Sequence, residues 1–493
     1  MRRGSWFNVH RSALLGLMIA LAAVYATTIA PGLSWQHNGS DGGDLIAAAA
    51  SGGVPHPTGY PAYIMLARLF LLLPIGSPAF RTNALSSVCA MIACALVADT
   101  VRWNYEGKRV CALAGGLVAG FAFGASPLLW SQAVITEVYS LHALLVAASL
   151  RALPIARDAS PRAFAAWGGL TGLAMTNHLT AVFLIPMGLV TAVFTPDRWR
   201  ALLFAIAGLA AGLTLYGLLP LWAARHPAIN WGGADSLAGF LWVVTGEPYR
   251  GLVFGVGSNV WSRLQTASGL MIDQFGVAGL LISFGGLFVG SRRRNALRWA
   301  LLWMVAAFLA FAIGYNSTDS FTYLLPVWMT LAIGLGAGVA GCLEIILVRW
   351  RWLAPSAVTL AGMAIFANAI PAMAFADASR SGEAERFGQA VLSGAPLDAI
   401  VITQEDRDSF ALWYWREAAN QRRDLVVIVE RLLRFDWYRD QLRWTYPDLS
   451  IPAEAGEGWL DGLVKSNQRP VCRTLLDRPE VLDCLSLKES RLP

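Results

Sequence analysis

The sequence predicts an α-helical polytopic membrane protein with about eleven transmembrane helices and a small C-terminal extracytoplasmic α/β domain. Of its 493 residues, 56% are hydrophobic and only 14% are charged, whereas soluble domains carry about 25% charged residues. Apolar runs long enough to cross a hydrocarbon layer of ~30 Å recur along most of the chain. Basic residues gather in alternate connections between these runs, which is typical of membrane proteins with a fixed orientation.

The apolar runs define the expected membrane helices. They cover residues 12–30, 82–100, 110–125, 138–153, 163–176, 179–194, 201–220, 269–289, 299–314, 321–348 and 353–375. A cleaved signal peptide is the alternative for the first run. The apolar core of a signal peptide has about 7–15 residues, so the longer run at 12–30 favours a retained span.

Charge decides the orientation. One set of connections carries seventeen basic residues: Arg2, Arg3, Arg11, Arg102, Lys108, Arg109, Arg151, Arg157, Arg162, Arg198, Arg200, Arg292, Arg293, Arg294, Arg298, Arg349 and Arg351. The opposite set carries five: Arg68, Arg81, Arg225, Arg250 and Arg263. Cytoplasmic loops hold the excess of Lys and Arg. The N-terminus is therefore expected in the cytoplasm and the tail outside the cell inner (plasma) membrane.

This topology divides the chain into a membrane domain, 1–376, and an extracytoplasmic domain, 377–493. The membrane domain has two long outer connections, 31–81 and 221–266. The first includes residues 60–73, which are too few for a confident span and predict an interfacial helix. In the second, Trp231 and neighbouring rings have two interpretations, anchoring at the membrane interface or stacking on a sugar.

The tail alternates β-branched runs with helical patterns. Residues 398–403 and 425–429 predict strands, and 409–419 and 431–444 predict helices, an order that indicates parallel strands. The acidic turn "TQEDRDSF" between the first strand and helix could be a solvated loop with an N-cap at Asp408, or could reach over a cavity below it. Cys472 and Cys484 are expected to form a disulfide if the tail faces an oxidising compartment.

Acidic residues and histidines collect on the outer side of the predicted membrane domain. Asp41 and Asp44 follow the first span, and Glu137, His178 and Asp319 flank later ones. Such groups at span ends are costly unless they face protein or a watery cavity, so their gathering predicts a site there. The alternative is a set of loop carboxylates that only solvate a surface.

Several classes of site have no motif in the sequence. There is no G-x-x-x-x-G-K-[ST] loop of a P-loop nucleotidase, and no H-E-x-x-H or paired C-x-x-C of a zinc enzyme. We therefore expect no metal, no cofactor and no nucleic-acid partner.

Five blocks resemble a known family, in the expected order. They are "SDGGDLIAAAASGGVPHPTGYPAYIMLARLF", "WSQAVITEVYSLHAL", "TNHLT", "INWGGADSLAGFLWVVTGEPYR" and "YNSTDSFTYLLP", and "AIVITQEDRDSFALWYW" is similar to the block that opens the family's outer domain. The family is the domain of unknown function 2723 family, grouped with GT-C membrane glycosyltransferases that include protein O-mannosyltransferases. This chain has Asp41-Gly42-Gly43-Asp44 where the family usually has a D-S-G-E type element.

The resemblance implies a membrane glycosyltransferase that moves a sugar, with mannose a candidate, from a polyprenyl-phosphate donor to a hydroxyl of a secreted or envelope protein or glycan. Asp41 matches the first family acid and is the expected catalytic base; Asp44 matches the second and would orient the acceptor or share that role. The chemistry also needs groups for the phosphate and sugar. The candidates are His56, Tyr60, Arg81, Glu137, His178, Arg225, Trp231, Arg250 and Asp319.

Two other functions use the same features. A transporter or lipid flippase would use the outer acids as a translocation path and predicts charged residues deep within spans. A non-catalytic assembly protein would use the tail as its binding module and predicts that Asp41→Asn leaves function intact.

Overall fold

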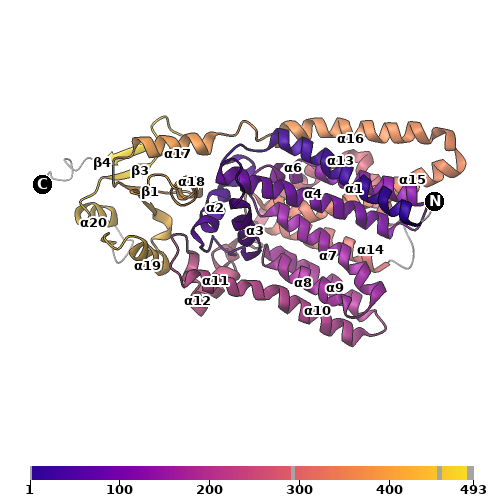
Figure 1. The fold of residues 1–493 in the computed structure, drawn as a ribbon, viewed down its shortest axis with the longest axis horizontal. Helices are drawn as coiled ribbons and strands as arrows, with labels where there is room; N and C mark the ends of the chain where they lie inside the picture. Colours follow the sequence, from indigo (N-terminus) through magenta and orange to yellow (C-terminus); the bar gives the residue numbers. More distant parts are fainter. Residues whose placement is uncertain (1–2, 290–294, 452–457, 486–493) are drawn as a thin grey trace.

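The computed structural model describes residues 3–289, 295–451 and 458–485. Figure 1 shows an elongated molecule in which a bundle of long helices carries a small α/β domain at one end, with the two termini at opposite ends. Polar segments that connect the helices form the junction between the two parts.

Apolar composition accounts for the bundle. Among the described residues, seven helices are long and apolar enough to cross a membrane, and the bent pair α5–α6 makes an eighth if it is one span. The main bundle helices are α1 (Arg3–Thr28), α4 (Pro78–Asn104), α5 (Arg109–Gly124), α7 (Tyr139–Ala159), α8 (Ala163–Met175), α9 (Ile185–Val193), α10 (Arg198–Leu213), α13 (Val260–Leu287), α14 (Asn295–Gly314), α15 (Leu325–Arg349) and α16 (Ala354–Ala376). All eleven apolar segments fall on helices, while the number of crossings stays a prediction.

Two predicted spans are interrupted. The segment 110–125 ends at Ser126, whose side chain accepts from the Leu129 N–H and starts the short helix α6 (Pro127–Ala133) at a 65° bend. The segment 179–194 opens with the 3-10 turn η2 (Leu179–Leu184). Both breaks lie near the α/β domain, so they bring irregular backbone and polar groups to the end of the bundle where the site lies.

The outer connection 31–81 folds into three short elements. These are the 3-10 turn η1 (Gln36–Asp41), α2 (Gly42–Ser51) and α3 (Pro61–Leu71). Helix α3 corresponds to the predicted interfacial helix: Ala62 and Ala67 are buried, whereas Met65 and Leu69 are exposed. The second outer connection contains α11 (Leu218–Ala223), η4 (Trp231–Gly233), α12 (Leu237–Val244), η5 (Glu247–Leu252) and η6 (Gly257–Asn259).

The C-terminal domain contains a four-stranded sheet in the order β2-β1-β3-β4. Strand β1 (Ile400–Thr403) pairs in parallel with β2 (Val426–Val429) and β3 (Val471–Thr474), and β4 (Leu482–Leu485) pairs antiparallel to β3. The remaining elements are α17 (Glu383–Gly394), α18 (Asp406–Trp413), the π-helical turn η10 (Tyr414–Ala418), η11 (Glu430–Leu432), α19 (Asp436–Thr445) and α20 (Trp459–Ser466). The strand–helix–strand–helix order has the predicted parallel pairing.

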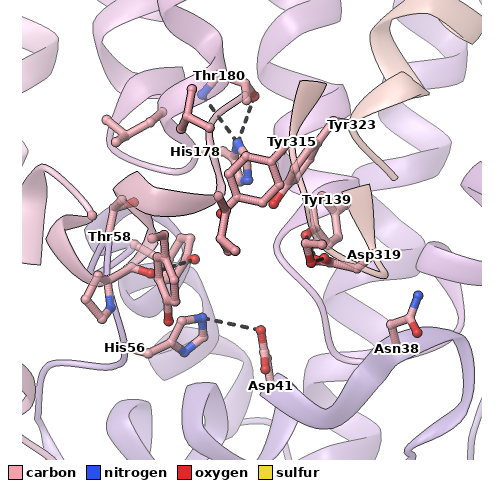
Figure 2. A pocket seen from close by; sticks show the side chains of 18 of the residues that line it. Asn38, Asp41, His56, Thr58, Tyr139, His178, Thr180, Tyr315, Asp319 and Tyr323 are labelled. Carbon is pink, nitrogen blue, oxygen red and sulfur yellow. Dashed lines mark hydrogen bonds and ion pairs between the residues drawn. The ribbon is translucent and has the colours of Figure 1, made fainter. Parts of the chain in front are cut away.

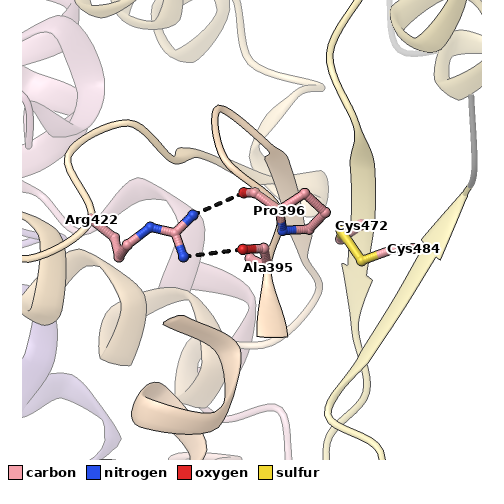
Figure 3. Close-up of a disulfide and its surroundings, with 5 residues drawn as sticks. All are labelled: Ala395, Pro396, Arg422, Cys472 and Cys484. Atoms are coloured by element: carbon pink, nitrogen blue, oxygen red, sulfur yellow. Dashed lines mark hydrogen bonds between the residues drawn. A yellow bond between two sulfur atoms is a disulfide. The ribbon is translucent and has the colours of Figure 1, made fainter. Parts of the chain in front are cut away.

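Local contacts stabilise this domain at two places. Cys472 and Cys484 are joined in a disulfide between β3 and β4. Figure 3 shows Arg422 donating to the carbonyls of Ala395 and Pro396, at 3.1 and 2.8 Å, ahead of β1. These contacts connect turns whose carbonyls would otherwise lack a protein partner.

A close approach of two helices joins the domain to the bundle. A Cβ added at Gly43 of α2 would lie 2.2 Å from the carbonyl oxygen of Phe410 in α18. Only glycine allows this packing without a backbone shift. The glycine beside the acidic pair therefore brings α18 directly over the start of α2.

Candidate functional site

A cavity of about 550 Å³ lies where the bundle meets the C-terminal domain. Residues from η1, the α2–α3 loop, the start of α7, η2, η5, the segment 311–323 and α18 line it, so regions distant in sequence contribute. Seven predicted site residues are among its lining: Asp41, His56, Tyr60, His178, Trp231, Arg250 and Asp319. A cavity of this size with few charged groups and many rings is typical of a small-molecule site.

Asp41 presents its carboxylate to the cavity. It is the last residue of η1 and precedes α2, and 39% of its side chain is accessible. Its Oδ2 lies 3.4 Å from Nε2 of His56 (Figure 2). Burial raises the pKa of Asp41 to about 6, with nearby acids adding to the rise and His56 opposing it. A carboxylate with a pKa near neutrality is suited to general base catalysis.

Asp44 lies beneath this pair and does not line the cavity. Its side chain is fully buried and accepts three hydrogen bonds. The backbone N–H and Nδ1 of His56 donate to Oδ2 at 2.9 and 2.7 Å, and the indole Nε1 of Trp231 donates to Oδ1 at 3.0 Å. Asp44 therefore fixes the orientation of His56, and of the pair Asp41 and Asp44 only Asp41 lines the cavity.

His56 is held between the two carboxylates. Burial lowers the pKa of its imidazole, but Asp41 and Asp44 raise it by more, so the pKa reaches about 9 and the ring is a cation at neutral pH. Its ring stacks on Phe410 at 6.2 Å and meets the edge of Tyr60 at 5.0 Å. A fixed cation inside a water-poor cavity is suited to binding an anionic group.

The opposite wall of the cavity is aromatic. The ring of His178 lies 5.6 Å from Tyr139 and 5.3 Å from Tyr323 (Figure 2). The backbone N–H of Thr180 lies 3.4 Å from Nδ1 of His178. Because a backbone N–H can only donate, Nδ1 is the acceptor, and Nε2 carries the proton of the neutral ring. Burial lowers the pKa of His178 to about 4, so it is neutral here.

Asp319 completes the polar part of this wall. The Tyr139 hydroxyl donates to its Oδ2 at 3.2 Å and the Ser317 hydroxyl donates to its Oδ1. Val182, Phe183 and Phe311 also line the cavity, and the rings of Phe183 and Phe311 are 5.6 Å apart. This apolar part of the wall is suited to hydrocarbon.

Three predicted substrate-binding residues lie elsewhere. Arg81 donates to the carbonyls of Leu71, Ile75 and Gly76, so its guanidinium supports the end of α3. Arg225 is exposed after α11 and does not line the cavity. Glu137 is buried in the loop before α7, where its side chain accepts from the Val138 N–H; burial and the Asp41 charge raise its pKa.

Two predictions about local structure are corrected. Trp231 is only 7% exposed and bonds Asp44, so it is not an anchor at a lipid interface. Helix α18 begins before Asp408: Glu405 is its N-cap, and the Asp408 side chain accepts from the Glu405 N–H to complete a capping box. Asp406 and Arg407 consequently fall in the first helical turn.

The C-terminal domain supplies residues from the acidic turn 403–410, for which reaching over a cavity is one of the two interpretations from the sequence, although none of its residues is among the predicted site residues. Asp406, Arg407 and Phe410 of α18 line the cavity, and burial raises the pKa of Asp406. Arg407 also pairs with Asp477 at 2.9 Å. One signal for this placement exists in the sequence, because α18 directly follows the carboxyl end of the parallel strand β1, where α/β domains place their functional loops.

Within residues 3–289, 295–451 and 458–485, no group of three or more His, Cys, Asp or Glu side chains is arranged to hold one metal ion.

Comparisons with known proteins identify two matching family models and two similar curated proteins. Residues 41–202 match a family model described as the Protein O-mannosyl-transferase TMEM260 N-terminal domain, and residues 384–457 match the TMEM260-associated domain 2. The chain is 26% identical to the Protein O-mannosyl-transferase TMEM260 of Mus musculus over 504 residues, covering 94% of this chain and 69% of that protein. It is 28% identical to the Dictyostelium discoideum protein of the same name over 300 residues, 55% of this chain and 35% of that one.

Solved structures show the same architecture. ArnT from Cupriavidus metallidurans bound to undecaprenyl phosphate superposes with a TM-score of 0.61 at 12% identity, over 96% of this chain and 93% of ArnT. Its apo state superposes with a TM-score of 0.56 at 13% identity over the same shares. The predicted fold class, a GT-C-like helical membrane protein with a small C-terminal sheet domain, is confirmed.

Proposed function

We propose that this protein is a membrane glycosyltransferase that transfers mannose from a polyprenyl-phosphate donor to a hydroxyl of a secreted or envelope protein. The names of its curated relatives and the ArnT-like fold support the class of enzyme. The observation that carries the proposal is the cavity in which Asp41 faces His56, because a carboxylate beside a cation supports a base for the acceptor and a site for the phosphate.

In this proposal Asp41 acts on the acceptor. The carboxylate takes the proton of the acceptor hydroxyl as that oxygen forms a bond to the anomeric carbon of the donor sugar. The bond from the anomeric carbon to the phosphate oxygen breaks, and its electron pair leaves with the polyprenyl phosphate. Asp44 acts through His56 as a positioning residue, since it lies outside the cavity.

Cations and donors around the cavity suit the other parts of the donor. The imidazolium of His56 and the guanidinium of Arg250, which lies beside Glu247 at 2.6 Å, serve the leaving phosphate. His178 Nε2–H and Asp319 serve sugar hydroxyls, with Tyr60 and Trp231 in the wall. The apolar part of the wall near Phe183 and Phe311 serves the first part of the lipid.

The charge bias supports an orientation for this reaction. The N-terminus is cytoplasmic, and residues 377–493 form a domain outside the inner (plasma) membrane, above the membrane domain 1–376. The disulfide between Cys472 and Cys484 is consistent with an oxidising compartment.

A transfer assay tests the proposal. The purified protein is given radiolabelled polyprenyl-phosphate mannose and a pool of extracytoplasmic proteins, and label on protein is measured. We expect transfer that Asp41→Asn lowers by about 10²- to 10⁴-fold, the usual contribution of general base catalysis. Absence of transfer with several sugar donors would overturn the enzyme assignment. Transfer that survives Asp41→Asn would overturn only the assignment of the base.

A further inference from the structure

A second cavity, of about 420 Å³, lies at the junction of the two domains. The outer connection contributes His226, Asn230, Gly233 and Asp235, and α19 contributes Trp437 and Trp444. We call it the junction groove. None of the residues that line the junction groove lines the cavity that contains Asp41 and His56.

Helix α19 presents one face to the junction groove. Trp437, Gln441 and Trp444 are spaced by four and three residues, so they lie on the same side of the helix. Trp444 is 63% exposed. His226 stacks on it with the ring centroids 4.2 Å apart and the planes at 10°. A large, preordered aromatic surface of this kind is typical of sites that bind polypeptides.

The loop opposite α19 is held in a costly conformation. His226 has φ +48°, a left-handed geometry that non-glycine residues rarely adopt. The Gln441 side chain fixes the loop by donating to the carbonyl of Pro227, and the Asn230 amide lies 3.4 Å from Gln441 Oε1. Backbone held in this way persists at binding sites.

The junction groove also contains unused hydrogen-bonding capacity. Asn230 is only 7% exposed and lines the groove, and within the described part of the chain its Oδ1 has no hydrogen-bond partner. Buried carbonyl oxygens of this type normally have a partner, so the group is suited to an N–H donor from a ligand. Asp235 is exposed on the same side and adds a negative charge.

One layer of rings separates the junction groove from the catalytic cavity. Trp231 lines the cavity, Trp437 lines the groove, and their centroids are 5.7 Å apart. From Asp41 the path passes His56 at 3.4 Å, and His56 lies 6.2 Å from Trp231. These steps total about 15 Å, which is the length of about five residues of extended chain at about 3.3 Å per residue.

We propose that the junction groove binds the acceptor polypeptide about five residues from the hydroxyl that receives the sugar. This inference rests on the proposed function. Trp444 packs against an acceptor side chain, Asn230 accepts from an acceptor N–H, and Asp235 favours a lysine or arginine. The acceptor is therefore recognised by both domains at once, over Trp231.

Kinetics with two readouts test this inference. The first readout is the acceptor concentration at half-maximal transfer, measured with the labelled mannose donor and the acceptor proteins of the transfer assay. The second is cleavage of the labelled donor without acceptor. We expect Trp444→Ala to raise the first value by about 30-fold, as for an interface hot spot, and Asp235→Asn to raise it by about fivefold. Donor cleavage stays unchanged in both variants.

Matched variants and a second measurement separate the outcomes. Leu397→Ala is the control for Trp444→Ala, because Leu397 is an apolar side chain of the same domain that is 77% exposed. Asp448→Asn is the control for Asp235→Asn, because it removes an exposed charge outside the groove. Both controls should leave the half-maximal acceptor concentration unchanged. Equal values for Trp444→Ala and the parent would overturn the groove assignment. Loss of donor cleavage in Trp444→Ala would also overturn it, because the residue would then support the catalytic cavity. Absence of transfer by the parent would overturn the proposed function instead.

Discussion

The arrangement of Asp44 beneath His56 predicts a specific effect of Asp44→Asn. An asparagine keeps one acceptor oxygen and places an NH₂ group where the second carboxylate oxygen receives hydrogen bonds. Either His56 or Trp231 then faces a donor in a fully buried position. A hydrogen bond to a charged group contributes about 1.5–3 kcal/mol. Because about 1.4 kcal/mol corresponds to a factor of ten, we expect kcat to fall about 10- to 100-fold.

The pH dependence gives a readout that a structural role alone would not change. The pKa of His56 is raised to about 9, so the cation is present below that pH and activity is lost as pH rises through it. The pKa of Asp41 is raised to about 6, so activity is lost as pH falls through that value because the base is protonated. Removing the Asp44 charge lowers the pKa of His56, so the alkaline limb moves to lower pH.

The assay is initial transfer rates from pH 5 to 10 with saturating donor and acceptor. Asp197→Asn is a suitable control because that carboxylate is 62% exposed at the start of α10. Thermal unfolding in detergent establishes that each variant is folded. An Asp44→Asn profile that is lower but has an unmoved alkaline limb would refute the role of Asp44 in charging His56. An unchanged kcat would refute its role in positioning the ring.

Three further predictions concern the junction, the disulfide and the topology. Gly43→Ala should lower the free energy of unfolding by about 1–3 kcal/mol, measured by thermal unfolding, because the added Cβ would meet the Phe410 carbonyl. The control Gly269→Ala should not lower it, because the space around Gly269 is open. Equal effects of the two variants would contradict the packing. Cys472→Ser removes the disulfide that closes a loop with a sequence separation of 12, and should destabilise the C-terminal domain by about 3 kcal/mol. We expect a lower unfolding midpoint by circular dichroism. An unchanged midpoint would contradict this role of the disulfide. Ser236→Cys should react with an impermeant maleimide in intact cells more than the parent does; reaction only after permeabilisation would reverse the orientation.

The sequence predicts the helices well because their signal is local. Apolar length and the loss of charge decide which segments enter a bundle, and these are properties of each segment alone. The same holds for α3, whose run is too short to span, and for the strand–helix order of the tail. Breaks such as Ser126-Pro127 also have local signatures, an N-cap followed by proline at N1, although the apolar pattern around them hides the bend.

The roles of the two acids could not be separated from sequence. Asp41 and Asp44 are three residues apart, and a 3-10 turn ends at one while an α-helix begins after it. This change of helix type turns Asp41 toward the cavity and Asp44 toward the interior, where it meets His56 twelve residues later. Arg81 illustrates the reverse error, because a basic residue on the outer side is a reasonable phosphate ligand until the fold directs it to backbone carbonyls.

The contribution of α18 shows what kind of information the sequence lacks. Asp406 and Phe410 reach the cavity only because Gly43 allows α18 to contact α2, more than 360 residues earlier in the chain. That contact depends on the absence of a side chain, which leaves no chemical signature at Phe410. The cation at His56 is favoured by Asp41 and Asp44 from one domain, and its ring stacks on Phe410 from the other. The C-terminal domain is therefore part of the wall of the proposed reaction site, and a change in the position of α18 should alter catalysis even when every acid is kept.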